Sequence, residues 1–219
     1  MKISHCEFPD DLLYDVERGL WAKPNGAFIR VGITTTLSWS LGSFAKVTVK
    51  EPGTEVEEGQ VIGSLDGSRN FEVVRSPVAG RVAAANPRLS TEPELLNRDP
   101  YGDGWLADIQ LRGPEGISKL VSLPAAATAI EKKIEERHVR CFAAFPDYEM
   151  YSVGTECSSV LVKLGDLLAN SPSRSVVHIV SDDVTAEAEM GRWSEATGNP
   201  VVDFRNEGGF FHFIVRKRD

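Results

Sequence analysis

Three cysteines are the side chains of this sequence that could carry covalent chemistry. Cys157 follows Gly-Thr-Glu and stands where a strand pattern gives way to a helical one. The free N–H groups and positive end of a helix stabilise a thiolate, so this position predicts a lowered pKa and a reactive thiol. A small buried core residue is the alternative for Cys157. Cys141 lies in the apolar run HVRCFAAF, which favours a core residue, and Cys6 lies in a terminus expected to be mobile.

Arg69 is the second residue of interest, because a hairpin should display it. Strands are predicted at about 60–65 and 70–75, joined through the polar tip 66–70 and followed by the turn SPVAG. A hairpin tip presents its side chains to solvent and to partners. Arg69 is therefore expected to be either a solvated loop residue or a docking residue for an anionic partner or ligand.

Other patterns predict structure rather than chemistry. The histidines lack the Cys/His spacing of a zinc site, so we expect no metal centre. The segment DPYGDG at 99–104 has no closing glutamate for a calcium loop, which favours a structural turn. Asp182 and Asp183 precede a helix start, where carboxylates cap free N–H groups. Phosphate-loop, dinucleotide and hydrolase motifs are absent from the sequence. The four histidines are His5, His138, His178 and His212.

Composition excludes several classes of protein. The chain has 219 residues, 24 basic and 32 acidic side chains and a net charge of −8, which argues against binding to nucleic acid. No apolar run reaches the length of a membrane span, and the acidic start lacks the apolar stretch of a signal peptide. Three scattered cysteines are too few for a disulfide framework. A cytoplasmic protein is expected.

The pattern of elements indicates two domains. Strands are expected at 27–33, 45–50, 60–65, 70–75, 80–84 and 105–111, short helices at 33–42 and 91–97, and a helix at 124–137. From about 147 the order becomes βαβαββ, with one helix starting near Cys157. We therefore predict a β-rich barrel-sandwich domain at 1–120, a helical connector at 121–145, and an α+β two-layer sandwich at 146–219.

The first domain resembles the H protein of the glycine cleavage system, a carrier that swings a lipoyl arm on a hairpin-tip lysine. The resemblance runs from about Tyr14 to Leu111 and rests on VGIT, LGSFAKVTVKEPGTEVEEGQ, SPVAGRV and especially NRDPYGDGW. In that family the modified lysine lies seven residues before the serine of the Ser-Pro turn, which is Arg69 here. A guanidinium is a poor acceptor for an acyl group. No lysine stands between Lys50 and Lys119, so no lipoyl cofactor is expected.

The second domain resembles the TusA-type (SirA/YeeD) sulfur carriers from about Met150 to Lys217. Gly-Thr-Glu-Cys matches that family's Gly-Leu-Arg-Cys, and SVVHIVSDDVTAEAEMGRW and GGFFHFIVRK match its later elements. The resemblance implies that Cys157 carries sulfane sulfur as a persulfide. The family's Cys-Pro-x-Pro is replaced here by Cys-Ser-Ser-Val, although serine can cap the same helical turn.

Together these resemblances imply a carrier or sulfurtransferase-like protein rather than a classical enzyme. In the main hypothesis Cys157 relays sulfur between donor and acceptor proteins, while a non-lipoylated H-like domain docks partners. The alternative is a non-catalytic adaptor or regulatory H-protein homologue, linked to glycine cleavage or lipoate metabolism, with both carrier residues lost. The placement of Cys157 favours the first hypothesis, and the loss of the lysine and of Cys-Pro-x-Pro favours the second.

Overall fold

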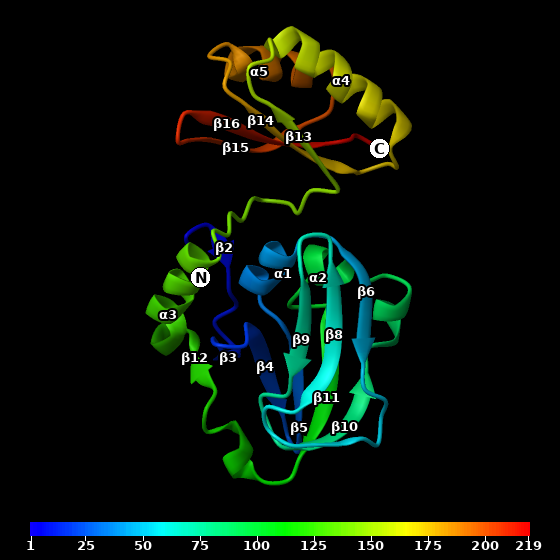
Figure 1. The fold of residues 1–219 in the computed structure, drawn as a ribbon, viewed down its shortest axis with the longest axis vertical. Coiled ribbons are helices and arrows are strands. Elements are labelled where there is room, and N and C mark those ends of the chain that lie inside the picture. The colour runs from blue at the N-terminus through cyan, green and yellow to red at the C-terminus, as the bar shows by residue number, and fades with distance from the viewer. The chain divides into compact units, whose positions relative to one another are not determined.

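The chain folds into two compact units, Met1–Cys141 and Phe142–Asp219 (Figure 1). The computed structural model describes residues 1–219, except for the side chains at positions 114 and 115. No helix of the described chain is both long and apolar enough to cross a membrane.

The first unit is a β-sandwich built from a large and a small sheet, as predicted. The large sheet has seven strands in the order β12 (Val121–Ser122), β3 (Leu13–Asp15), β4 (Leu20–Asn25), β5 (Phe28–Ile33), β11 (Trp105–Leu111), β10 (Gly80–Ala85) and β7 (Glu55–Val56). The small sheet has three strands in the order β6 (Phe44–Val49), β8 (Val61–Gly67) and β9 (Phe71–Arg75). All strand pairings in both sheets are antiparallel.

Alternating apolar residues of these strands form the core of the first unit. In β5 the side chains of Ile29, Val31 and Ile33 are fully buried, and in β11 those of Ala107 and Ile109 are fully buried. Successive side chains of a strand point to opposite faces of a sheet, so this spacing directs one row inward. The short helices α1 (Thr35–Leu41) and α2 (Leu95–Arg98) and the 3-10 turns η1 (Pro87–Ser90) and η2 (Pro114–Ile117) connect the strands.

The six strands expected from the sequence in this unit are present, whereas β4, which has six residues, β3 and the two-residue strands were not predicted. β1 (Lys2–Ile3), β2 (Cys6–Glu7), β7 and β12 have two residues each, too few to show a period in the sequence. β4 ends at Pro24-Asn25, which reads as a turn signal, and Pro24 pairs with Ile29 near the end of the β4–β5 ladder. A proline is tolerated at such a strand end.

The helix expected as a connector belongs to the first unit. α3 (Leu123–Glu136) buries Leu123, Ala126, Ile130 and Ile134. These apolar positions recur every three or four residues and so form one face of the helix. α3 is thus part of the compact unit Met1–Cys141, whereas a helical connector was expected at 121–145.

The N-terminal segment is ordered, and its cysteine is bonded. Cys6 and Cys141 form a disulfide with a Cα–Cα distance of 5.0 Å across 135 residues of sequence. Both side chains are buried. The expectation of a mobile Cys6 is therefore wrong, and Cys141 is a buried core residue as predicted, but one that is bonded to Cys6. The pairing depends on the β1–β2 hairpin, which places Cys6 beside the end of the first unit.

The second unit has the βαβαββ order expected for a two-layer sandwich. Its elements are β13 (Tyr148–Ser152), α4 (Cys157–Asn170), β14 (Val176–Ser181), α5 (Ala186–Thr197), β15 (Val201–Glu207) and β16 (Phe210–Arg216). The sheet order is β13-β14-β16-β15, and only the β13–β14 pair is parallel. Both helices cover one face of this sheet (Figure 1). Val160, Leu164 and Leu168 of α4 are buried there, as the spacing predicts.

Candidate functional site

The hairpin tip of the first unit is held against the carboxyl end of α1. The tip joins β8 to β9, and its backbone N–H groups donate to the last residue of α1 and to Ser43, two residues beyond it. Arg69 N donates to Leu41 O at 3.0 Å, and Ser68 N donates to Ser43 O at 2.8 Å. Ser43 N in turn donates to Ser68 Oγ at 3.1 Å. The tip is therefore a fixed turn rather than a free loop.

A glycine at the end of α1 makes this close approach possible. Gly42 has φ +81°, a conformation that residues with a Cβ rarely adopt. A Cβ at this position would lie 2.3 Å from Ser68 Oγ and 3.1 Å from Arg69 Cγ. Gly42 is thus required both by the backbone turn and by the contact with the tip.

The motif NRDPYGDGW fixes α1 at both ends. At its start Thr35 N donates to the hydroxyl oxygen of Tyr101 at 3.0 Å. At its end the side-chain amide of Asn97 donates to Gly42 O and to Ser38 Oγ, each at 3.0 Å. Asn97 is buried, so these bonds form away from water. The motif therefore positions the helix that in turn holds the hairpin tip.

The acidic part of this motif is a turn, as predicted, rather than a cation loop. The carboxylate of Asp99 accepts a hydrogen bond from Asp103 N at 2.7 Å, and its carbonyl accepts one from Gly104 N at 2.9 Å. A Cβ on Gly102 would lie 2.3 Å from Asp99 Oδ2, and one on Gly104 would lie 2.6 Å from Leu95 O. Both glycines are explained by close packing.

Arg69 itself caps the helix. Its Nη1 donates to Trp39 O at 2.9 Å, so both its backbone and its guanidinium bind carbonyls of the last turn of α1. A cation at a helix carboxyl end is favoured by the unpaired carbonyls and by the helix dipole. The side chain is nevertheless exposed at the tip. Capping is a third role, which neither of the two sequence-based expectations for Arg69 included.

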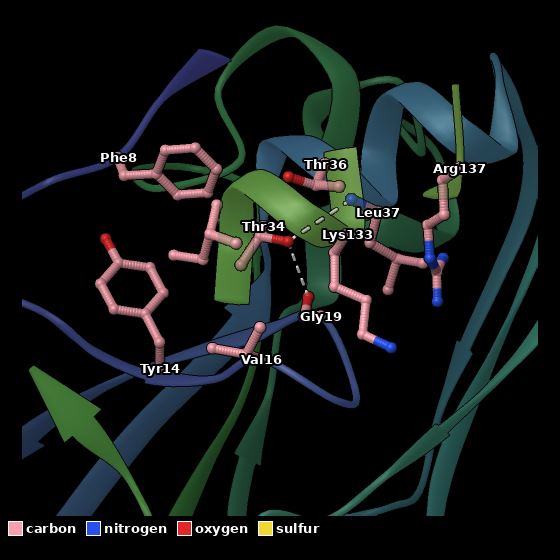
Figure 2. A pocket seen from close by; sticks show the side chains of 10 residues that line it. Phe8, Tyr14, Val16, Gly19, Thr34, Thr36, Leu37, Lys133 and Arg137 are labelled. Atoms are coloured by element: carbon pink, nitrogen blue, oxygen red, sulfur yellow. Dashed lines mark hydrogen bonds between the residues drawn. The ribbon is translucent and has the colours of Figure 1, made fainter. Parts of the chain in front are cut away.

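A small cavity lies beside α1 in the same unit. Thr34, at the N-cap of α1, donates to Gly19 O at 3.1 Å and accepts from Leu37 N at 3.4 Å (Figure 2). The cavity holds only about 20 Å³, which is room for about one water molecule. The buried hydroxyl of Thr36 faces no hydrogen-bond partner among the described residues. The other residues that line the cavity include Phe8, Tyr14, Val16, Ile130, Lys133 and Arg137.

In the second unit Cys157 is the first residue of α4, as predicted. The carboxylate of Asp183 already accepts a hydrogen bond from this end of the helix. The N–H of Cys157 donates to Asp183 Oδ2 at 2.8 Å. The second oxygen of that carboxylate accepts from the N–H and the hydroxyl of Thr185, both at 2.8 Å. These bonds lower the pKa of Asp183, which therefore carries its negative charge beside the helix end.

This environment makes the thiol of Cys157 a weak acid, contrary to the expectation of a lowered pKa. Its side chain is 2% exposed. Burial, a hydrogen bond to Glu189 and the negative charges of Glu189 and Asp183 together raise the pKa of Cys157 to about 12. A helix start lowers a thiol pKa only when the N–H groups face the sulfur in a site open to water, and here a carboxylate takes that place.

The remaining residues of interest do not gather into one site. The rings of His178 and His212 meet in the second unit, with His178 Nε2 and His212 Nδ1 3.0 Å apart, while His5 lies in a turn and His138 follows α3. Among the described residues no group of three or more His, Cys, Asp or Glu side chains could hold a metal ion. Asp182 accepts from Gly154 N at 2.8 Å, in the turn after β13, so the predicted capping of helix N–H groups is made by Asp183 and not by Asp182.

Comparisons with known proteins concern the first unit. The family model described as glycine cleavage H-protein matches residues 12–136. A probable glycine cleavage system H protein 2 of Sulfurisphaera tokodaii is 34% identical over 142 residues, covering 64% of this chain and 96% of that protein. A probable glycine cleavage system H protein of Haloarcula marismortui is 37% identical over 125 residues, covering 57% of this chain and 98% of that protein. A solved H protein of Mycobacterium marinum is 24% identical with a TM-score of 0.48, covering 60% of this chain and all 100% of that one.

Proposed function

We propose that this chain, which belongs to the glycine cleavage H-protein family through residues 12–136, acts as an adaptor that binds glycine cleavage or lipoate-linked enzymes without carrying a lipoyl group. The observation that carries this proposal is Arg69. It stands at the hairpin position that the family resemblance assigns to the modified lysine, and its guanidinium binds Trp39 O. An arginine is always protonated and forms no stable acyl amide under ordinary conditions.

The fixed backbone of the tip supports this proposal, because it would present a defined surface to a partner enzyme. The hydrogen bonds of Ser68 and Arg69 to the end of α1 hold the backbone in place, and the exposed side chains remain available to a partner. We therefore expect the partner-binding surface to persist after the loss of the acceptor amine. Such a protein would compete with a lipoylated H protein for the same enzymes and would not support their turnover.

Lipoylation is tested by co-expressing the chain with a lipoate ligase and measuring the intact mass. The wild-type chain should keep its unmodified mass, and Arg69→Lys should gain one lipoyl group if the ligase accepts the tip. Arg75→Lys is the matched control, because it places a lysine on the same hairpin but outside the tip. A lipoyl group on the wild-type chain would overturn the assignment of the tip.

The adaptor role is tested in a reconstituted glycine cleavage assay that contains a lipoylated H protein. Added wild-type chain should inhibit turnover, and excess lipoylated H protein should relieve the inhibition. Without lipoylated H protein the chain should support no turnover. If a molar excess of the chain leaves the rate unchanged, the proposal that it binds these enzymes is wrong.

Sulfur relay through Cys157 is the second candidate. It is supported by the position of Cys157 at the first residue of α4 and by the βαβαββ order, which matches the resemblance to TusA-type carriers. In this reaction a sulfane donor R–S–SH and the thiol form R–SH and a persulfide on Cys157. The buried thiol with a pKa of about 12 weighs against it, so we rank it below the adaptor.

Mass spectrometry after incubation with a sulfane donor distinguishes the two candidates. Relay predicts a reversible gain of one sulfur, about 32 Da, that disappears in Cys157→Ala. The adaptor predicts no adduct at Cys157 in the folded protein. The disulfide between Cys6 and Cys141 leaves Cys157 as the free thiol of the described chain, so the readout is specific.

A further inference from the structure

A groove in the second unit lies between its two helices and the C-terminal tail. It has a volume of about 380 Å³ and opens to solvent. The residues come from α4, from α5 and the turn after it, and from the segment that follows β16. They are Gly165, Leu168, Ala169, Trp193, Ala196, Thr197, Asn199, Lys217 and Arg218.

The floor of the groove is apolar because small residues separate the two helices. Gly165 and Ala169 lie on α4 and Ala196 on α5, so little side-chain volume fills the space between them. A Cβ built on Gly165 would meet no atom within 4 Å. Leu168 and the ring of Trp193 pack on the core of the unit and give the groove an apolar wall. An apolar body would therefore be removed from water on entering it.

Two cationic side chains, Lys217 and Arg218, line one end of the groove, and no acidic side chain lines it. Lys217 Nζ donates to Ser171 O at 2.6 Å, which uses one of its three N–H groups. Arg218 N donates to Asn199 Oδ1 at 2.9 Å. Within the described part of the chain neither cation forms an ion pair with a carboxylate. The neighbouring Asp219 lies 3.7 Å from Arg174 instead.

We propose that this groove binds a small amphipathic anion, with an apolar or aromatic body against Trp193 and a carboxylate, sulfonate or phosphate group at Lys217 and Arg218. A volume of about 380 Å³ lies within the range of about 300–1,000 Å³ that is usual for small-molecule sites. An apolar floor with a few polar groups at one end is also the usual composition of such a site. The proposal does not depend on the function of the first unit.

Helix stabilisation is the competing explanation for the two cations. Both follow β16 and lie near the carboxyl ends of α4 and α5, where positive charge is favoured. That explanation accounts for the charges, and it predicts that filling the open floor has no effect on the binding of a small molecule. The two explanations therefore differ in the response to a substitution at Gly165.

The first experiment titrates the full-length protein with 8-anilinonaphthalene-1-sulfonate and records its fluorescence. A Cβ at Gly165 meets no atom within 4 Å, so Gly165→Leu should project into the groove and weaken binding at least tenfold, while the thermal stability is kept or raised, because glycine is unfavourable inside a helix by about 1 kcal/mol. Gly191→Leu is the matched control. Gly191 lies in α5, its Cβ would also meet nothing within 4 Å, and it does not line the groove.

The charge requirement is tested with a neutral probe and a second pair of variants. N-phenyl-1-naphthylamine, which has the same body without the sulfonate, should bind at least fivefold more weakly to the wild type. Arg218→Gln should weaken binding of the sulfonate about fivefold, and Arg192→Gln, a cation on α5 outside the groove, should change it less than twofold.

Three outcomes would overturn the proposal. One is the absence of saturable binding of the sulfonate to the folded wild-type protein. Another is equal binding to Gly165→Leu and Gly191→Leu. The third is binding of an acidic peptide, but of neither the sulfonate nor dodecanoate, which would make the groove a protein-docking surface instead.

Discussion

Replacing Gly42 with alanine should detach the hairpin tip from α1. At φ +81° and ψ −160° a residue with a Cβ lies in a region that is almost restricted to glycine, which costs about 1–3 kcal/mol. The new Cβ would also lie 2.3 Å from Ser68 Oγ, and such overpacking costs about 1–3 kcal/mol more. Gly42→Ala should therefore lower the free energy of unfolding of the first unit by about 2–6 kcal/mol.

The variant Gly53→Ala separates the conformational cost of a Cβ at positive φ from the cost of the clash with the tip. Gly53 has φ +92°, and a Cβ there would meet nothing within 4 Å, so only the conformational cost of about 1–2 kcal/mol applies. Both substitutions restrict the unfolded chain alike, so that effect cancels in the comparison. The difference between the two variants measures the contact with the tip.

Urea unfolding followed by tryptophan fluorescence is a suitable assay, because Trp21, Trp39 and Trp105 all lie in the first unit. Ser68→Ala in the Gly42→Ala background should recover part of the loss, since it removes the nearest clashing atom. The tip geometry described above is refuted if Gly42→Ala is no more destabilising than Gly53→Ala, or if Ser68→Ala brings no recovery.

Three further predictions concern buried groups. Asn97→Ala should cost about 2–4 kcal/mol in urea unfolding, because it leaves buried hydrogen-bonding groups at the end of α1 without partners; a loss below about 1 kcal/mol would contradict this. Cys157 should react with iodoacetamide only slowly at pH 7. As its folded pKa is raised, the stability it contributes should be lost as the pH rises from about 9 to about 12, and Cys157→Ala should abolish this loss. Under oxidising conditions Cys6→Ser should lower the free energy of unfolding by about 2–5 kcal/mol relative to the wild type, because the disulfide is lost. The variant should then be as stable as the reduced wild type. Equal stabilities of the oxidised wild type and the variant would exclude a formed disulfide.

The sequence by itself determined most of the longer helices and strands and the identity of the tip residue, although β4 was missed. Strands such as 105–111 and the helix from Cys157 carry their period within a few consecutive residues, so the local pattern is sufficient. The spacing of Arg69 to the Ser-Pro turn placed it at the hairpin tip. The pairing of β8 with β9 agrees with this position. The motif at 97–105 was recognised from its letters, but the hydrogen bonds of Asn97 and Tyr101 to α1 were not foreseen.

Only the tertiary structure decided the states of the cysteines and the groove. Cys6 and Cys141 are separated by 135 residues, and no local pattern reports that distant segments meet. The pKa of Cys157 was misjudged because Asp183 and Glu189, which are 26 and more residues away, reach its helix start only after folding. Short-range periodicity records which face of an element is buried. Long-range contacts decide which charges and side chains surround each residue on that face, and these contacts set the pKa values and the shape of a binding site.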